Sequence, residues 1–358
     1  MTRRKSIYAM ASIYIGTVIG AGFASGQEIL QFFGKYGNYG ILGMLISTII
    51  LGGVGAKTLA RVYDLGIKDF HEFGNQHFYK KLFKGIEIIL AFLLYTSFFI
   101  MLSGGGAIGE EFFALSKIWG ILIMLVASFI VFVFGVQGIS KANILIVPFL
   151  SLGIIIISIY VIRDNSYYFR EMARQLSGGL SFKNCFKGLG RAGYGWLWSA
   201  IIYASHNSIG AIVVMTSLLP IIYDQRSAKL AGILGATALG IMGGLILLNL
   251  LILQTNLIGL EIPMLAIVYP MGSFLRKGYG LVLLLAMFTT AIANGYGAIL
   301  GFSRILGWGE AWMKIIICLT ALPLANMGFK NLISFFYPLF GYIGFLFIGA
   351  IFLKAKGE

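Results

Sequence analysis

A glycine-rich string near the N-terminus is the first feature of this sequence that could perform chemistry. Gly16, Gly20, Gly22 and Gly26 lie in the string GTVIGAGFASGQ, inside a long apolar run. Glycines spaced by four are also typical of plain helix packing in membranes. Each glycine costs about 1 kcal/mol relative to alanine in a helix interior, so four of them favour a helix that opens locally. An opened helix exposes carbonyl groups that can coordinate a cation and N–H groups that can bind a carboxylate.

A polar string, YASHNS at positions 203–208, interrupts a second apolar run. Polar and ionisable side chains are costly inside a membrane and usually face a cavity or another polar group. His206 in this string has two interpretations, and the residues leave both open. It is either a proton carrier or substrate ligand, or a neutral histidine that a neighbouring helix satisfies.

Hydroxyl and carboxyl groups add two further candidates. Thr289 and Thr290 are adjacent hydroxyls that could supply oxygen ligands to Na⁺, although threonines in membrane helices often only bond back to the helix carbonyls. Glu28 and Glu87 lie within or near apolar runs, and either could accept a coupling proton.

The elements that must position these groups follow from the composition. The 358 residues are 59% hydrophobic and 11% charged, whereas soluble domains carry about 25% charged residues. A bilayer core of about 30 Å needs about 20 apolar residues per helical crossing, so the length allows roughly ten crossings and no soluble catalytic domain. The long continuous runs also exclude a β-barrel. The sequence predicts an all-α integral membrane protein.

Ten apolar runs bounded by charges or turn residues are predicted to span the membrane. They are Ser6 to Phe33, Tyr39 to Val62, Ile86 to Phe113, Ile118 to Phe134, Ala142 to Ile162, Tyr194 to Leu219, Leu230 to Leu253, Tyr279 to Ile305, Ala311 to Leu324 and Leu332 to Leu353. Two shorter segments predict helices that do not cross: an interfacial helix over Lys68 to Phe83 and a short helix over Pro263 to Leu275.

The ten runs divide into two sets of five. Two sets with an odd number of crossings must be inserted in opposite orientations, so any internal symmetry is an inverted repeat. We expect a first repeat over residues 1–163 and a second over residues 164–358, together forming one membrane domain. The glycine string and the polar string lie in corresponding spans, the first and the sixth.

The net charge of +14 comes from basic clusters between the apolar runs. Such clusters are topology signals and do not indicate nucleic-acid binding. The basic residues at both chain ends predict cytoplasmic termini in a multi-pass protein of the cell membrane. Protease and hydrolase motifs such as HExxH and GxSxG are absent from the spans, so the sequence does not indicate an enzyme. No cofactor is indicated either.

The string Gly16 to Phe33, GTVIGAGFASGQEILQFF, together with Tyr203 to Asn207, resembles the YkvI-like family of bacterial membrane proteins. That family is similar to amino-acid permeases with the LeuT fold, within the amino acid–polyamine–organocation superfamily. The resemblance implies a 5+5 inverted repeat of about ten transmembrane helices. It also implies that helices 1 and 6 are broken around a central substrate site.

The resemblance assigns roles residue by residue. It implies a sodium site formed by the carbonyls of Gly16 and Ile19 and the hydroxyls of Thr289 and Thr290. The residues that it implies for substrate binding are Val18, Ala21, Gly22, Tyr95 as a third-helix gate, Tyr203 and His206. Phe23 and Ala204 replace the side chains of a second sodium site, and Gly26 replaces the arginine of an outer gate, so neither feature is expected.

The resulting hypothesis is a secondary active transporter of a small neutral amino acid or related zwitterion. It predicts symport with one Na⁺ by alternating access, with the lipid bilayer and a small-molecule substrate as the partners. Two alternatives remain. One is a proton-coupled permease that uses His206 or a membrane glutamate, and the other is a transporter-like ligand sensor without flux.

Overall fold

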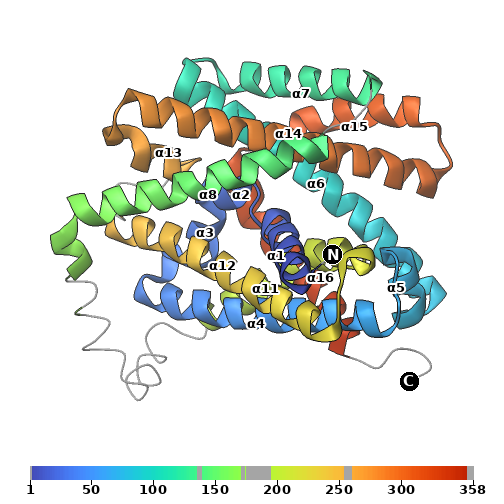
Figure 1. The fold of residues 1–358 in the computed structure, drawn as a ribbon. Helices are drawn as coiled ribbons and strands as arrows, with labels where there is room; N and C mark the ends of the chain where they lie inside the picture. Colours follow the sequence, from blue (N-terminus) through green and yellow to red (C-terminus); the bar gives the residue numbers. More distant parts are fainter. Residues whose placement is uncertain (1, 135–138, 171–173, 175–194, 254–259, 353–358) are drawn as a thin grey trace.

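The structure is a computed structural model that describes residues 2–134, 139–170, 174, 195–253 and 260–352. Every regular element within these ranges is a helix (Figure 1). Eight of these helices are long and apolar enough to cross a membrane. The prediction of an all-α, multi-pass membrane protein is therefore confirmed.

All ten predicted spans correspond to helical segments. The first is divided into α1 (Arg3–Val18), α2 (Ala21–Ala24) and α3 (Gln27–Phe32). The other nine are α4 (Asn38–Asp64), α6 (Lys80–Phe113), α7 (Lys117–Phe134), α8 (Ile139–Asp164), α11 (Gly195–Met215), α12 (Gln225–Ile252), α14 (Ser273–Leu306), α15 (Glu310–Ala325) and α16 (Phe329–Phe352). At 16 residues each, α1 and α15 are roughly 24 Å long, shorter than the bilayer core.

Short helices connect the spans where the sequence predicts them. The first is α5 (Phe70–His77), which begins at Asp69, whose carboxylate accepts the N–H of Glu72 at 2.7 Å. The second is α13 (Pro263–Val268), which leads into a 3₁₀ turn at Tyr269–Met271. Two further 3₁₀ turns, Gly34–Tyr36 and Leu219–Ile221, precede α4 and α12.

The spans pack in two groups (Figure 1). One group contains α6, α7, α14 and α15, and the other contains α4, α11 and α12 with α1. Helices at equivalent positions of the two halves contact each other, including α4 with α12, α6 with α14 and α7 with α15. Their lengths also match, with 27 and 28 residues for α4 and α12, and 34 for both α6 and α14. The inverted repeat stays a prediction, which this pairing supports.

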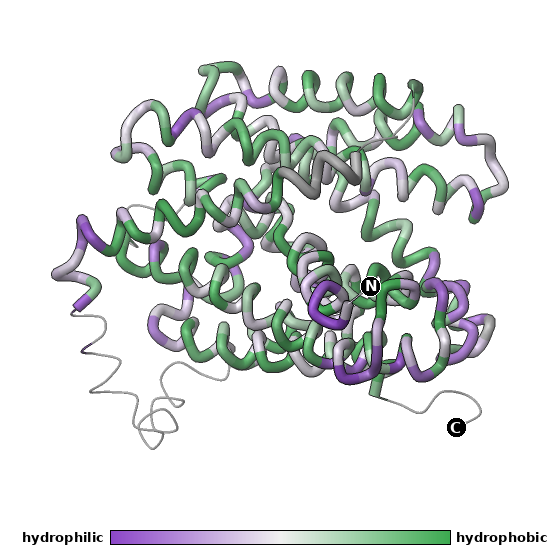
Figure 2. The backbone as a smooth tube through the Cα atoms, in the orientation of Figure 1, coloured by the Kyte–Doolittle hydropathy of each residue, from purple (hydrophilic) through white to green (hydrophobic). Residues whose placement is uncertain are grey.

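The outer faces of the helices are apolar. Figure 2 shows hydrophobic residues along the helices and hydrophilic residues mainly near helix ends and connections. Large apolar side chains such as Ile49, Ile123 and Phe149 are exposed. Because soluble proteins rarely expose extended apolar surface, these faces are suited to contact with lipid.

The predicted break in the sixth span is wrong for this structure, because α11 is continuous from Gly195 to Met215. The polar side chains of the string are accommodated without opening the helix. Ser208 Oγ donates to the Ala204 carbonyl at 2.7 Å, and Asn207 Nδ2 donates to the Tyr203 carbonyl at 3.2 Å. Bonds of this kind to the carbonyl four residues earlier satisfy a polar side chain inside an intact helix.

Candidate substrate site around the broken first helix

The interruption between α1 and α2 releases backbone carbonyls. The Gly20 N–H donates to the Val18 carbonyl at 2.8 Å, and Gly20 is extended with φ −102° and ψ −177°. The Gly20 N–H therefore does not donate to the Gly16 carbonyl, as it would in a continuous α-helix. The last four carbonyls of a helix have no partner within that helix. Gly16 and Ile19, whose carbonyls are predicted sodium ligands, lie at this point.

The residues after the break are held by two neighbouring elements. Tyr279 Oη of α14 donates to the Ala24 carbonyl at 2.6 Å, and the Met264 N–H of α13 donates to the Ser25 carbonyl at 3.0 Å. Gly26 then turns the chain into α3 with φ +79°, a left-handed conformation that favours glycine. The segment from α2 to α3 is thus fixed on the side that faces α13 and α14.

Glu28 in α3 is a buried acid that bonds to the polar string of α11. The residue is only 4% exposed, and its Oε1 accepts a hydrogen bond from Asn207 Nδ2 at 3.1 Å. A Cβ on Gly22 would lie 3.3 Å from Glu28 Oε2 and 2.8 Å from Tyr337 Oη. The carboxylate and the Tyr337 hydroxyl therefore both approach the backbone of α2 where glycine leaves room.

His206 lies against α16. Its ring stacks on Tyr337 with centroids 4.4 Å apart and also lies 6.4 Å from the ring of Phe340. His206 Nδ1 is buried and has no hydrogen-bond partner among the described residues. Because an unpaired buried nitrogen costs free energy, this atom is available to a ligand or to water.

A cavity of about 320 Å³ lies beside these groups. It is bounded by α1, α6, α11, α14 and α16. Its polar lining consists of Thr17, Ser97, His206, Asn207, Asn294 and Tyr337, and its apolar lining consists of Leu90, Leu93, Leu94, Ile100, Ile209, Gly210, Val213, Val214 and Phe340. Small-molecule sites of this kind are mostly apolar, with a few polar groups that orient the ligand.

Of the predicted substrate residues, His206 lines this cavity, and the others do not. Val18, Ala21 and Tyr203 are buried, and a Cβ on Gly22 would lie 2.8 Å from Oη of the cavity residue Tyr337. The assignment of a backbone role to Val18, Ala21 and Gly22 stays a prediction.

Tyr95 does not line this cavity, and its assignment as a gate stays a prediction. Its hydroxyl donates to Thr320 Oγ1 of α15 at 2.7 Å. The cavity side of α6 carries Leu90, Leu93, Leu94 and Ser97, which follow helical spacing. Tyr95 follows Leu94 by one residue, so its side chain is rotated by about 100° from that face.

The predicted sodium ligands lie in α1, at the residue after α1 and in α14. The Thr289 hydroxyl donates within α14, to the carbonyls of Leu285 at 3.0 Å and Ala286 at 3.2 Å. A Cβ on Gly16 would face Val147 of α8 at 3.9 Å, and α8 packs against α14. Freed carbonyls and hydroxyls are hard oxygen donors that suit Na⁺. The site formed by Gly16, Ile19, Thr289 and Thr290 stays a prediction.

Glu87 lies apart from this region. It belongs to the first turns of α6 and is partly exposed, with His71 Nδ1 at 3.7 Å from its Oε1. It does not line the cavity. Of the two acids predicted as proton carriers, only Glu28 is adjacent to the cavity.

Asn294 and Tyr337 line the cavity and were not predicted from the sequence. Asn294 donates to Ser97 Oγ at 2.7 Å and joins α14 to α6 across the cavity wall. Its spacing of four residues from Thr290, on the same helix face, was the available signal. Tyr337 precedes Pro338 inside the apolar α16, and an aromatic hydroxyl there was the signal for a polar site.

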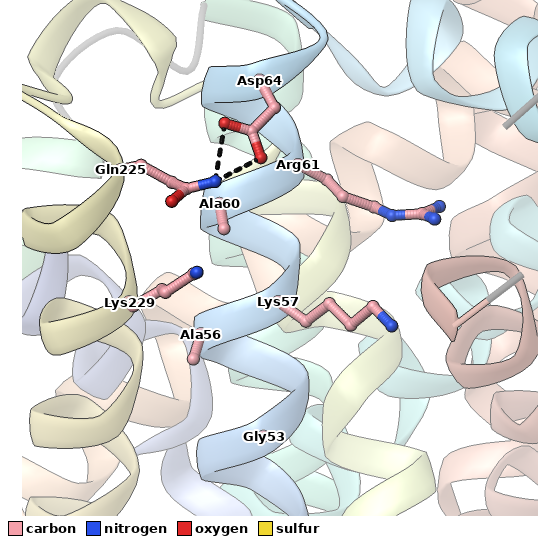
Figure 3. A pocket seen from close by; sticks show the side chains of 8 residues that line it. All are labelled: Gly53, Ala56, Lys57, Ala60, Arg61, Asp64, Gln225 and Lys229. Atoms are coloured by element: carbon pink, nitrogen blue, oxygen red, sulfur yellow. Dashed lines mark hydrogen bonds between the residues drawn. The ribbon is translucent and has the colours of Figure 1, made fainter. Parts of the chain in front are cut away.

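A second hollow of about 380 Å³ lies between the ends of α4 and α12 (Figure 3). Gln225 Nε2 bonds both oxygens of Asp64, at 3.0 and 2.7 Å. Lys57 and Arg61 point to the opposite side of α4 from Lys229, and Lys57 Nζ lies over the Phe352 ring at 4.3 Å. This hollow has no interrupted helix and no convergent basic groups, so it is not the candidate site.

Comparison with solved structures confirms the LeuT-like fold. The chain is similar to MhsT in complex with L-phenylalanine, with a TM-score of 0.63, 17% identity, and coverage of 97% of this chain and 89% of MhsT. It is also similar to a mutant of the manganese transporter of Eremococcus coleocola, with a TM-score of 0.55, 14% identity, and coverage of 94% and 76%. At these identities the likeness concerns the fold alone.

No family model matches the sequence. The chain is 32% identical over 345 residues to the membrane protein YkvI of Bacillus subtilis (strain 168), covering 96% of this chain and 95% of that protein. The aligned region extends over nearly the whole of both chains. The chain therefore belongs to the family of the membrane protein YkvI.

Proposed function

We propose that this protein is a secondary active transporter of a small neutral amino acid or related zwitterion, coupled to one Na⁺ by alternating access. The observation that carries the proposal is the break at Ile19–Gly20, which releases carbonyl groups next to a polar-lined cavity. The fold shared with MhsT, a protein seen in complex with L-phenylalanine, supports the amino-acid class. Most of the cavity lining is apolar, which suits a solute with an apolar body.

The energetics of one coupled sodium ion are sufficient. One charge that crosses 100 mV supplies about 2.3 kcal/mol, and a tenfold ion gradient adds about 1.4 kcal/mol. Together they support accumulation of several hundred-fold, with no need for a nucleotide. In this proposal Gly16, Ile19, Thr289 and Thr290 hold the ion, and α1 and α11 flank the substrate.

The experiment is uptake of radiolabelled L-leucine and L-phenylalanine into proteoliposomes with an inward sodium gradient. Uptake should require sodium and should fall sharply in Thr290→Ala. The matched control is Thr237→Ala, because Thr237 is an exposed threonine of α12 that only bonds back to Ile233 at 2.9 Å. Uptake that is unchanged when both the sodium and proton gradients are removed rejects the proposal.

A proton-coupled permease is a second candidate because Glu28 is buried beside the cavity. It predicts uptake that an inward proton gradient drives in sodium-free buffer. Glu28→Gln should abolish that uptake, and Glu87→Gln should leave it intact.

We also infer the arrangement in the membrane. Residues 1–163 and 164–358 are the two inverted repeats, and both termini are cytoplasmic, following the basic residues near Arg3 and Arg4. Reporter fusions at either end should be active only when the reporter requires the cytoplasm.

A further inference from the structure

Glu28 is a buried acid that has no cationic partner in the described part of the chain. The residue is 4% exposed and lies in α3, directly after the interrupted first helix. Among the described acids, Asp224 pairs with Arg3, Glu87 lies 3.7 Å from His71, and Glu261 pairs with Lys117. Glu28 takes part in none of these pairs.

One amide donor is a poor match for a buried carboxylate. Removing an ionised carboxylate from water costs several kcal/mol, which usually requires an opposite charge and several hydrogen bonds. Glu28 Oε1 accepts a hydrogen bond from Asn207 Nδ2, which also donates to the Tyr203 carbonyl at 3.2 Å. If Glu28 only joined α3 to α11, a neutral glutamine would do so at lower cost. The acid is therefore suited to a positive group that arrives from outside the protein.

The second carboxylate oxygen of Glu28 lies close to the backbone of α2 at Gly22. Glu28 Oε2 lies 3.3 Å from the position of a Cβ on Gly22, and Tyr337 Oη lies 2.8 Å from that same position. Asn207 and Tyr337 both line the cavity, so Glu28 lies directly behind the wall that they form. The stacked rings of Tyr337 and His206 add an aromatic surface, and aromatic faces attract cations.

We propose that Glu28 supplies the counter-charge for the ammonium group of the solute that enters this cavity. Asn207 holds one carboxylate oxygen, and the other, beside the Tyr337 hydroxyl, receives the ammonium group. The solute class is small primary amines with an apolar body, α-amino acids included, because apolar side chains form most of the rest of the cavity. This inference rests on the proposed function in taking the same cavity as the transport site, and it names the group that is recognised.

The test uses chemical modification of the carboxyl group, which does not depend on transport. The purified full chain in detergent is treated with dicyclohexylcarbodiimide, a hydrophobic reagent for carboxyl groups, and the modification of each peptide is followed by mass spectrometry. The probes are 3-methylbutylamine, L-leucine and 4-methylpentanoate, which share one hydrocarbon body and differ in their charged groups. At a probe concentration of ten times its dissociation constant, modification of Glu28 should slow about tenfold with the amine and with L-leucine.

Controls separate charge pairing from general protection. Modification of the partly exposed Glu87 should be unaffected by every probe, and Glu28→Gln should remove the modified peptide. Equal rates at Glu28 with and without the probes overturn the proposal, and so does protection by 4-methylpentanoate as strong as that by the amine. Where Glu28 does not react in the ligand-free protein, binding of 3-methylbutylamine decides: Glu28→Gln should weaken it, and unchanged binding overturns the proposal.

The same probes distinguish this inference from the proposed function. Protection of Glu28 by the amine without any uptake of L-leucine supports the inference and rejects the transporter. Sodium-dependent L-leucine uptake that Glu28→Gln leaves at the wild-type rate supports the transporter and rejects the inference.

Discussion

Replacing Gly22 by alanine is the sharpest test of the geometry around the broken helix. The added methyl group would lie 2.8 Å from Tyr337 Oη, 3.3 Å from Glu28 Oε2 and 3.6 Å from a ring carbon of Tyr337. Tyr337 has little room to retreat because its ring is stacked on His206 at 4.4 Å. The matched control is Gly20→Ala, since nothing lies within 4 Å of a Cβ there and the φ of −102° is accessible to alanine.

The size of the effect follows from overpacking. An extra methyl group in a well-packed interior typically costs about 1–3 kcal/mol. If Tyr337 and Glu28 are displaced to relieve the contact, the free energy of ligand binding becomes less favourable by the same amount. This corresponds to an affinity that is about 5- to 150-fold weaker. Gly20→Ala should change neither stability nor affinity to this extent.

Two measurements check this prediction. The unfolding midpoint of the purified protein should fall in Gly22→Ala and stay close to wild type in Gly20→Ala. The apparent affinity for L-leucine in proteoliposomes should follow the same order. Adding Tyr337→Phe, which removes the oxygen at 2.8 Å, should partly restore the stability of Gly22→Ala, with a coupling free energy of about 0.5–3 kcal/mol. Equal losses in the two alanine variants, or no recovery in the double variant, would refute the reasoning.

Three other predictions concern the segments that hold the site. Gly26→Ala should lower the free energy of unfolding by about 1–2 kcal/mol because alanine is strained at φ +79°, whereas Gly53→Ala, with open space around its Cβ, should not. Hydrogen bonds from Ser227, of which the one from its backbone N–H has the largest effect, hold the pKa of Asp224 below its ordinary value of 3.8. The stabilisation by this carboxylate is therefore present at neutral pH and is lost as the pH falls through its folded-state pKa. Acid titration of the unfolding midpoint should show a smaller loss in Asp224→Asn than in wild type. Tyr279→Phe removes the hydrogen bond to the Ala24 carbonyl, worth about 0.5–1.5 kcal/mol, and should raise the rate at which a cysteine placed at Met264 reacts with a thiol reagent. An unchanged rate would show that this bond does not hold α2 against α13.

The number and order of the spans could be predicted because membrane insertion depends on the length and polarity of each run. A run of about 20 apolar residues satisfies the bilayer whatever its neighbours are. The helices α4 and α12 therefore appear where the runs from Tyr39 and Leu230 predict them, although α12 begins five residues before its run, at Gln225. The extra turn at the start of α12 comes with the cap at Asp224, whose side chain accepts the Ser227 N–H at 2.6 Å.

The rotation of each helix about its axis could not be predicted. A soluble helix marks its buried face by polarity, but α6 is apolar on all sides because its outer face contacts lipid and its inner face contacts other helices. Tyr95 was therefore equally able to face the cavity or α15, and packing against Thr320 decides between them. Because the rotation of α14 about its axis was equally unknown, the sequence did not indicate that Asn294 bonds to Ser97.

Polarity alone also does not determine where a membrane helix opens. The string from Tyr203 to Ser208 is more polar than the string from Gly16 to Gly26, yet α11 is continuous and the first span is not. Serine and asparagine carry hydrogen-bonding groups that can return to the carbonyl four residues earlier, so their own helix satisfies them. Glycine has no such group, and it lowers the cost of leaving the helix.

Glycine content in turn marks the region of the break, and tertiary contacts select its position. Gly16 lies within α1, Gly20 is extended with open space beside it, Gly22 leaves room for Tyr337, and Gly26 takes the left-handed turn. An opened backbone inside a membrane is tolerated only where its groups find partners in the protein or line a water-filled cavity. After the break, Tyr279 and Met264 bond the carbonyls of Ala24 and Ser25. Before the break, no such bond reaches the Gly16 carbonyl within the described part of the chain, and the next residue, Thr17, lines the cavity. The unsatisfied end of α1 is thus the end that borders the cavity, which is the arrangement expected if a solute or its coupling ion completes the coordination.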